Sequence, residues 1–222
     1  MKKLAAQAFA KAGAGLLLCA LLLFGPAGTL HWVGAWRFLA ALFLPMVVVG
    51  VVLLRKAPEL LKKRLNAKEE QATQKGVILV SALLFAADFV LCGLDYRFGW
   101  SAVPGWLEWA ALAAFLLGYA LYGEVLRENA WLSRTVEVQQ GQQVVDTGLY
   151  GVVRHPMYAA TVLLFLSMPL ILGSLWGFVL LLAYPAVLVP RILNEETVLK
   201  EGLPGYEAYM KKVRWRLIPF VW

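Results

Sequence analysis

The amino-acid sequence predicts an all-α, polytopic integral membrane protein: a bundle of five or six transmembrane helices in which the last two form a helical hairpin. Apolar residues make up 61% of the 222 residues and charged residues 16%, against roughly 25% charged in a soluble domain. A soluble globule of this size could not hide so much apolar surface. The apolar residues form long runs, and the basic residues collect between alternate runs. Together these observations predict that lipid surrounds most of the chain.

Four apolar runs each suit one membrane crossing, because a span needs about 20 residues at about 1.5 Å each to cross a hydrocarbon core of roughly 30 Å. They cover residues 12–30, 38–54, 76–94 and 104–123. We expect the first run to remain a span and not to be removed as a signal peptide. Asp88 stands inside the third run, where an ionisable group is costly. It marks either a functional group or a carboxyl that is protonated or paired within the bundle.

The last apolar run, residues 157–190, is too long for one straight crossing. As a single helix it would extend about 51 Å, well beyond the hydrocarbon core. Pro169 and the pair Gly173-Ser174 lie near its middle. The run therefore predicts two short helices joined by a tight turn, the fifth and sixth spans. One tilted and kinked helix is the alternative.

The distribution of charge predicts the orientation. With six spans and an interior N-terminus, the cytoplasmic segments are residues 1–11, 55–75, 124–156 and 191–222. These segments hold 19 of the 21 Lys and Arg residues, and the external loops hold only Arg37 and Arg97. Positive residues stay on the cytoplasmic side of membrane proteins, so both termini are expected there, at the inner membrane if the source is bacterial. The net charge of +7 is then a topology signal, and we expect membrane lipids around the chain but no nucleic-acid partner.

Aromatic residues support the same orientation, whereas nothing in the sequence indicates a metal. The predicted external ends of the spans carry a belt of tryptophans, as membrane interfaces do: Trp32, Trp36, Trp100, Trp106, Trp109 and Trp176. The two cysteines, Cys19 and Cys92, lie inside spans and have no metal-ligand spacing. We expect both to be small buried hydrophobic residues.

The chain divides into an N-terminal four-span region, residues 1–123, and a C-terminal region, residues 124–222, that mixes spans with polar clusters. Residues 136–145 read VEVQQGQQVV, and the valines around a Gln-Gly turn signal predict a small hairpin. The tail after residue 190 is expected to begin as a helix and to break at residues 202–205, which contain Pro204. Function is expected in this C-terminal region, at the cytoplasmic edge of the fifth and sixth spans.

One polar cluster stands at the mouth of the fifth span: Arg154, His155, Pro156, Met157 and Tyr158. Proline suits the first turn of a helix, where its missing N–H costs nothing. The residues before it therefore lie at a helix N-terminus, which attracts anions such as carboxylates. A snorkelling arginine beside interfacial aromatics is the plainer interpretation, but four such residue types within five positions favour a binding site.

A second cluster follows the sixth span, where Arg191 precedes the pair Glu195-Glu196. Arg191 and Glu195 are four positions apart, so they share one helical face and can pair. An ordinary surface ion pair is the alternative. Their position at the membrane edge favours the functional interpretation.

At these residues the sequence resembles the isoprenylcysteine carboxyl methyltransferases and their prokaryotic relatives, within the wider group of membrane phospholipid methyltransferases. The likeness covers roughly residues 135–222. The matching pieces are Gly148-Leu149-Tyr150, Arg154-His155-Pro156-Met157-Tyr158, Glu195-Glu196 with Leu199, Gly205-Tyr206, Tyr209 and Arg216-Leu217-Ile218-Pro219. The sequence departs from the family at Ala160, where glycine is frequent, and at Gln142, where the eukaryotic enzymes have histidine.

The resemblance implies S-adenosyl-L-methionine as cofactor, in a pocket on the cytoplasmic side. The positions it assigns to the cofactor are Gln142, Gln143, Val144, Val145, Tyr150, His155, Pro156, Met157, Tyr158, Glu195 and Glu196. Arg191 corresponds to the arginine that faces the methyl acceptor, and Arg154 joins it as a substrate-binding candidate. Arg191 and Glu195 are the catalytic candidates, and the acceptor is expected to be a lipophilic small molecule or lipid.

Two other functions remain open. The Arg-His-Pro-x-Tyr box is shared with integral-membrane sterol reductases, which use NADPH, and Arg154, Lys200 and Lys211 could then bind the 2′-phosphate. A non-enzymatic membrane scaffold would bind no cofactor. The acceptor itself also stays open among a prenylated cysteine, a phospholipid amine, a thiol and a small isoprenoid acid.

Overall fold

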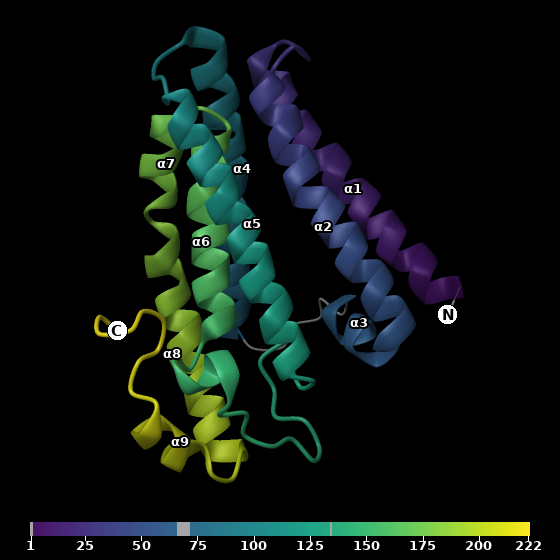
Figure 1. Ribbon diagram of the computed structural model, residues 1–222, viewed down its shortest axis with the longest axis vertical. Coiled ribbons are helices and arrows are strands. Elements are labelled where there is room, and N and C mark those ends of the chain that lie inside the picture. The colour runs from purple at the N-terminus through teal and green to yellow at the C-terminus, as the bar shows by residue number, and fades with distance from the viewer. Residues whose placement is uncertain (1, 66–71, 134) are drawn as a thin grey trace.

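The computed structural model describes residues 2–65, 72–133 and 135–222, and every regular element in them is helical (Figure 1). The helices are α1 (Lys2–Ala27), α2 (Val33–Lys56), α3 (Pro58–Leu65), α4 (Ala72–Phe98), α5 (Gly105–Glu128), the short 3-10 helix η1 (Gly148–Gly151), α6 (Pro156–Ile171), α7 (Leu175–Leu181), α8 (Tyr184–Gly202) and α9 (Tyr206–Lys212). The predicted all-α class is confirmed.

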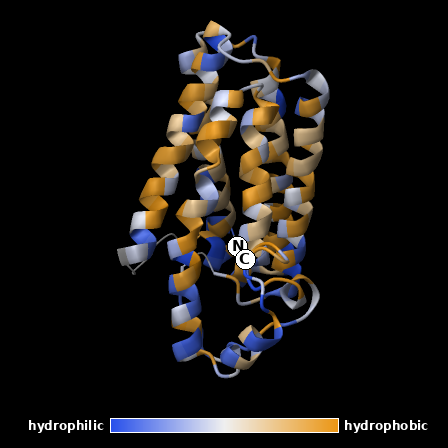
Figure 2. Ribbon diagram, turned by 90° about the vertical axis from the view of Figure 1, so that its left-hand side faces the viewer, coloured by the Kyte–Doolittle hydropathy of each residue, from blue (hydrophilic) through white to orange (hydrophobic). Residues whose placement is uncertain are grey.

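Five helical stretches are long and apolar enough to cross a membrane. They are Lys2–Ala27, Val33–Lys56, Thr73–Phe98, Gly105–Glu128 and Leu175–Gly202. The apolar helix α6 is shorter, with 16 residues, and at about 1.5 Å per residue it does not span a hydrocarbon core of roughly 30 Å alone. Orange apolar residues fill the middle of the bundle and blue polar residues gather at its two ends (Figure 2). The protein is a multi-pass integral membrane protein.

The last apolar run forms the predicted hairpin, with α6 before the turn and α7 and α8 after it, and the alternative of one kinked helix is wrong. The first helix runs through Pro169 and ends at Ile171. Gly173 then adopts a positive φ of 82°, and the Ser174 side chain caps α7 by accepting a 3.0 Å hydrogen bond from the Gly177 N–H. The turn therefore forms at Gly173-Ser174, because a proline near a helix end removes one hydrogen bond without stopping the helix, whereas a glycine with positive φ stops it.

The two ends of the bundle carry different segments of the chain. We call the end that carries α3, α9, residues 129–133 and residues 135–147 the pocket end, and the end that carries residues 28–32, 99–104 and 172–174 the loop end (Figure 1). An ion pair between Arg37 and Glu108 joins α2 to α5 near the loop end.

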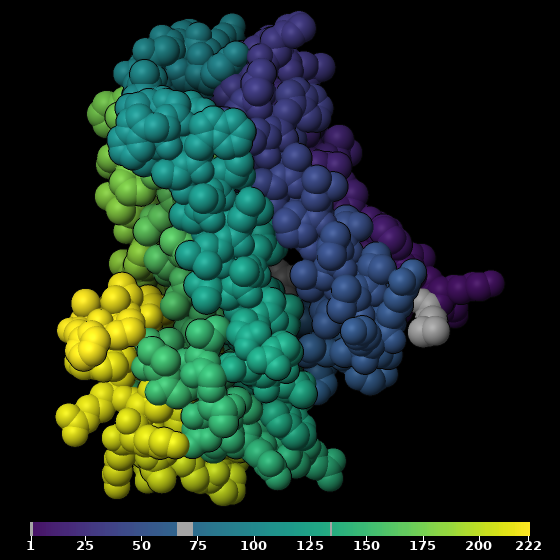
Figure 3. Space-filling view, viewed as in Figure 1, coloured from purple at the N-terminus to yellow at the C-terminus, as the bar shows by residue number. Residues whose placement is uncertain are grey.

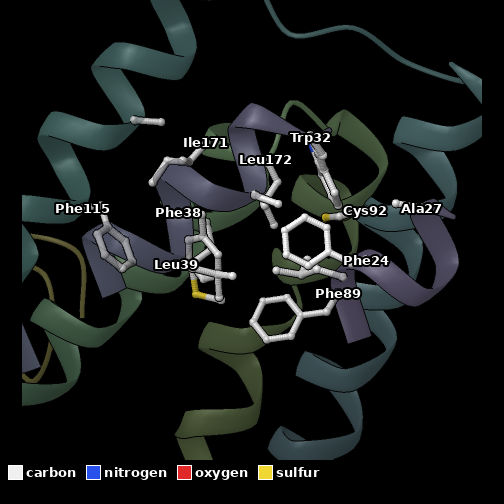
Figure 4. Packing of buried hydrophobic residues seen from close by; sticks show 14 of the residues in the cluster. Phe24, Ala27, Trp32, Phe38, Leu39, Phe89, Cys92, Phe115, Ile171 and Leu172 are labelled. Carbon is white, nitrogen blue, oxygen red and sulfur yellow. The ribbon is translucent and has the colours of Figure 1, made fainter. Parts of the chain in front are cut away.

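The main hydrophobic cluster packs near the loop end, where α1, α2, α4, α5 and α6 meet (Figure 4). Phe38 lies at its centre with no exposed surface, against the rings of Phe89 and Phe115. Trp32 belongs to this cluster, stacked on Tyr96 with 4.7 Å between ring centroids. Trp32 lies at the start of α2, as expected for the end of a span, but its ring is buried in this cluster. The other five tryptophans of the predicted belt are exposed.

Small residues allow the helices to approach closely, as is common in membranes. A Cβ added at Gly93 would lie 2.6 Å from the carbonyl oxygen of Leu23, so this glycine lets α4 contact α1. A Cβ added at Gly118 would lie 2.8 Å from Cγ of Leu164, where α5 packs on α6.

Asp88 is fully buried in α4, where its Oδ1 lies 3.9 Å from Sγ of Cys92. Within the described residues, its Oδ2 has no hydrogen-bond partner. Asp88 is thus not paired with a cation inside the described bundle.

The expected hairpin at residues 136–145 is wrong in part. The turn is present, since Gly141 has a φ of 75° and the Gln142 N–H donates to the Gln139 carbonyl at 3.0 Å. Residues 135–147 nevertheless contain no strand. Glutamine side chains bond to the loop, as Gln142 Oε1 accepts from the Gln139 N–H at 2.9 Å and Gln139 Nε2 donates to the Trp131 carbonyl at 2.5 Å. An isolated two-stranded ribbon is marginal in any case.

Candidate functional site

A cavity of about 90 Å³ lies at the pocket end, between the first turn of α6, the middle of α8, and the loop that follows α5. Its lining contains every residue assigned to the site from the sequence except Glu196. These twelve are Gln142, Gln143, Val144, Val145, Tyr150, Arg154, His155, Pro156, Met157, Tyr158, Arg191 and Glu195. We call this cavity the polar pocket. It also contains residues not assigned from the sequence: Asn129, Trp131, Leu132, Ser133, Thr135, Val136, Glu137, Leu199, Leu203, Tyr206 and Tyr209.

The first turn of α6 forms one wall of the polar pocket. Pro156 begins the helix, and the residues before it are held by the C-terminal tail. The N–H groups of Arg154 and His155 donate to the carbonyl oxygens of Trp215 and Arg216, each at 2.9 Å. The first N–H groups of any helix lack partners within it and favour negative charge, so this wall suits an anionic group of a ligand.

Three polar side chains meet in the polar pocket around the hydroxyl of Tyr158. This hydroxyl accepts a 2.8 Å hydrogen bond from Nε of Arg191 and donates one of 2.5 Å to Oε2 of Glu195. The sequence predicts that Arg191 and Glu195 share a helical face, and the structure places the Tyr158 hydroxyl between them. Among the described residues, Tyr158 is the hydrogen-bond partner of Glu195, which leaves its second oxygen available to a ligand.

Gln74 orients Arg191 from a third helix, and sequence reasoning missed it. This fully buried side chain of α4 accepts from Nη1 of Arg191 at 2.7 Å and donates to Oδ1 of Asn194 at 2.7 Å. It precedes the predicted third span and stands in a polar stretch that looks like a loop. No local signal distinguishes Gln74 from its polar neighbours, so only the packing of α4 against α8 reveals it.

Glu196 is absent from the described lining of the polar pocket. Its carboxylate instead binds side chains from the start of α6 and from the C-terminal tail. Its carboxylate accepts from Nε of Arg154 at 2.7 Å and from Nε of Arg216 at 3.0 Å, and it lies 3.3 Å from Nε2 of His155. The side chains of Arg154 and Glu196 are each only 4% exposed. Arg154 also donates from Nη1 to the carbonyl oxygens of Val213 and Arg214. The guanidinium of Arg154 therefore joins α6, α8 and the tail.

The short helix η1 places Tyr150 in the lining of the polar pocket. Gly148 has a φ of 51°, and a Cβ there would overlap the carboxylate of Glu128, which accepts from the Leu149 N–H at 3.1 Å. The Tyr150 hydroxyl accepts from Nδ2 of Asn129 at 2.9 Å. Burial raises the pKa of Tyr150 above its ordinary range, so its hydroxyl is neutral at physiological pH.

Tyr206 and Tyr209 of α9 also line the polar pocket. The Tyr209 hydroxyl donates to the Tyr150 carbonyl at 2.8 Å, and burial raises the pKa of both Tyr206 and Tyr209. Their rings are appropriate surfaces for an aromatic or cationic part of a ligand.

The polar pocket combines a carboxylate, a guanidinium, a helix N-terminus, neutral tyrosines and aliphatic walls such as Val144 and Leu199. This donor set fits S-adenosyl-L-methionine, which carries an amino group, a carboxylate, a sulfonium and an apolar adenine ring. Within residues 2–65, 72–133 and 135–222, no group of three or more His, Cys, Asp or Glu side chains could hold a metal ion.

Two comparisons with known proteins bear on this site. Residues 107–204 match the family model described as phospholipid methyltransferase. The chain is also similar to the Delta(14)-sterol reductase TM7SF2 of Mus musculus, with 32% identity over 91 residues. That match covers 40% of this chain and 22% of the reductase, so the chain spans about a fifth of the relative it matches. The family match includes α5 to α8 and all the assigned pocket residues, but not α1 to α4.

Proposed function

We propose that this protein is an integral membrane methyltransferase that uses S-adenosyl-L-methionine to methylate a lipophilic acceptor. The observation that carries the proposal is the Tyr158 bridge between Arg191 and Glu195. Most of the residues that line this pocket belong to the part of the chain that matches the family model. The phospholipid methyltransferase match supports both the cofactor class and a lipid-like acceptor. When bound, S-adenosyl-L-methionine supplies a methyl group activated by its positive sulfur.

The residues of the polar pocket then have distinct roles. Glu195 pairs with the amino group of the cofactor, and the first turn of α6 binds its carboxylate. Tyr150 and Tyr206 would hold its ring or its sulfonium. Arg191, oriented by Tyr158 and Gln74, directs the acceptor. For a carboxylate acceptor, which is already ionised at neutral pH, the protein needs no general base and contributes mainly by positioning.

The finer assignment to a carboxyl O-methyltransferase of the isoprenylcysteine type is part of this proposal. Arg191 supports it, because a guanidinium is a permanent cation that attracts a carboxylate. A phospholipid amine would instead favour a carboxylate or an aromatic surface at the acceptor position. The cofactor test below does not depend on which acceptor is used.

The first experiment is calorimetric titration of the detergent-purified protein with S-adenosylhomocysteine. We expect micromolar binding to the parent and at least a tenfold loss in Glu195→Ala, because a hydrogen bond to a charged group contributes about 1.5–3 kcal/mol. Glu207→Ala is the matched control, since Glu207 is an exposed glutamate of α9 and is absent from the described lining of the polar pocket. No binding to a folded parent would reject the proposal.

An NADPH-dependent reductase is the second candidate, and the similarity to the sterol reductase favours it. Such an enzyme needs a cation for the 2′-phosphate. Of the three basic residues expected to provide it, Arg154 lines the pocket but is bonded to Glu196 and two carbonyl oxygens. Lys200 and Lys211 are absent from the described lining of the polar pocket. Titration with NADPH on the same sample distinguishes the two functions.

A further inference from the structure

A second and larger cavity, of about 410 Å³, lies between α1, α2, α3 and the end of α5. We call it the apolar cavity. Its size is within the roughly 300–1,000 Å³ of small-molecule sites. Of its lining side chains, only those of Lys11, Arg64 and Tyr122 are polar. The surface is hollowed between α2 and α5 (Figure 3), and most of the cavity lining comes from the candidate membrane spans α1 and α2.

The polar side chains gather at one end of the apolar cavity. Arg64 donates to the Tyr122 hydroxyl and, from Nη1, to the Ser133 carbonyl at 3.1 Å. Nζ of Lys11 donates to the Leu65 carbonyl at 2.6 Å. Within the described residues, every acceptor of these two cations is neutral. A guanidinium in this situation retains its preference for a carboxylate or a phosphate.

Arg64 also joins the two cavities. Its Nη1 lies 3.9 Å from Sδ of Met157, and both Met157 and Ser133 line the polar pocket. An anionic group held by Arg64 would therefore lie at the edge of the polar pocket, while an attached hydrocarbon chain would extend away among the apolar residues of α1 and α2.

We propose that the apolar cavity binds the hydrocarbon chain of a single-chain anionic lipid taken from the bilayer, with its charged head against Arg64. The apolar lining fits the chain, the two cations fit the head, and the contact with Met157 connects the head to the polar pocket. The role of this lipid as methyl acceptor rests on the proposed function. The helices α1 to α3 that form the cavity lie outside the family match.

Two glycines provide a matched pair of variants. Gly50 of α2 lines the apolar cavity, and an added Cβ there meets no atom within 4 Å. Gly50→Phe therefore adds a bulky side chain at the cavity lining, with room for its Cβ. Gly13 of α1 has equal space but does not line the cavity, so Gly13→Phe is the control. Ala12→Phe, at a second lining position, repeats the test if the Gly50 variant does not fold.

The experiment is photolabelling of the purified protein with diazirine-bearing palmitic acid, followed by mapping of the labelled peptides. We expect labels on the lining segments of α1, α2 and α5, lost about tenfold or more in Gly50→Phe and retained in Gly13→Phe. Arg64→Gln is expected to weaken acid labelling about tenfold, because a charge-assisted hydrogen bond contributes about 1.5–3 kcal/mol. The corresponding palmityl alcohol should label the parent more weakly than the acid does.

Either of two results would overturn the proposal. Equal labelling of the Gly50 and Gly13 variants would mean that the probe contacts only the outer surface of the protein, as bulk lipid does, and does not enter the apolar cavity. Equal labelling by acid and alcohol would remove Arg64 as the head-group site. Titration with S-adenosylhomocysteine on the same variants separates the two proposals: mapped lipid labels without cofactor binding would reject the methyltransferase and leave the lipid site in place.

Discussion

Tyr158 is the residue on which the candidate chemistry depends most directly. Its hydroxyl connects Arg191 and Glu195, which lie one turn apart on α8, to the first turn of α6. Arg191 is in turn oriented by Gln74 from α4. Three helices therefore set the position of one guanidinium. Such support is needed to hold a substrate within a fraction of an ångström of its reactive geometry.

Replacing Tyr158 by phenylalanine removes the shared hydroxyl and leaves the ring. We expect methyl transfer from labelled S-adenosyl-L-methionine into a lipid extract to fall about 10- to 100-fold, because hydrogen bonds to charged groups contribute about 1.5–3 kcal/mol. Affinity for S-adenosylhomocysteine should change less than turnover, since Glu195 remains. Unchanged turnover in the variant would show that the bridge does not orient Arg191.

Tyr150 gives a pH-dependent prediction. Burial raises its pKa above the ordinary value of about 10. A raised pKa in the folded state contributes stability that is complete below about pH 10 and is lost as the pH rises further. In an alkaline titration followed by tyrosinate absorbance, Tyr150→Phe should remove no amplitude between about pH 9 and pH 11. The same substitution should remove one tyrosine's amplitude from the denatured protein.

At the residue scale, the sequence is informative where polar residue types are concentrated. The box from Arg154 to Tyr158 and the pair at Glu195 are visible because polar groups are rare beside apolar runs. The sequence does not show that Glu195 lines the polar pocket while Glu196 binds Arg154. Two adjacent glutamates on a helix differ only in the direction of their side chains. Gln74 is invisible for a different reason, because its partners Arg191 and Asn194 are more than a hundred residues away.

At the scale of elements, the contact of α5 with α6 depends on Gly118. We expect Gly118→Ala to destabilise the protein by about 1–3 kcal/mol, because its Cβ would crowd Leu164. Gly123→Ala on the same helix meets no atom within 4 Å, so it should be neutral or stabilise by up to about 1 kcal/mol through helix propensity. Unfolding in mixed micelles measures both, and equal effects would contradict the close packing.

The contact between the start of α6, α8 and the C-terminal tail depends on the carboxylate of Glu196. We expect Glu196→Ala to cost about 3–5 kcal/mol, because it leaves the buried guanidinium of Arg154 without its carboxylate. Glu124 is the control, since it pairs with the exposed Arg127 and such surface pairs contribute about 0–1 kcal/mol. Similar unfolding midpoints for the two variants would show that Glu196 is not a structural anchor.

The elements themselves were largely predictable because hydropathy alone specifies a span. The hairpin turn was located from Gly173 and Ser174, whose φ and capping roles are local properties. The sequence predicts a hairpin at residues 136–145 that the structure does not contain, because alternating valines form a strand only when a partner strand exists. Here the amide side chain of Gln139 takes the place of that pairing.

At the scale of the whole molecule, the orientation stays a prediction that the fold makes testable. Trp106 lies at the loop end and Lys211 at the pocket end, and both are exposed. With Cys19 and Cys92 replaced by alanine, we expect Trp106→Cys to react with an impermeant maleimide on intact cells. Lys211→Cys should react only after permeabilisation. The reverse pattern would place the termini outside.

The arrangement of α1 and α2 could not be predicted from the sequence. These helices lean away from the rest of the bundle toward the pocket end (Figure 1), and the apolar cavity lies where they separate from α5. Apolar runs predict that a helix crosses the membrane but not which neighbour it contacts along its length. The cavity and the position of Arg64 follow from that packing, so they appear only in three dimensions.

The hydrogen bonds between the C-terminal tail and the start of α6 have a consequence for biosynthesis. The guanidinium of Arg154 bonds to carbonyl oxygens 59 and 60 residues further along the chain. During translation, the first turn of α6 is therefore synthesised well before Val213 and Arg214, whose carbonyl oxygens bind Arg154. Membrane insertion and the maturation of the polar pocket are thus separate events, and a nascent chain that stops before Val213 would be inserted without an assembled pocket.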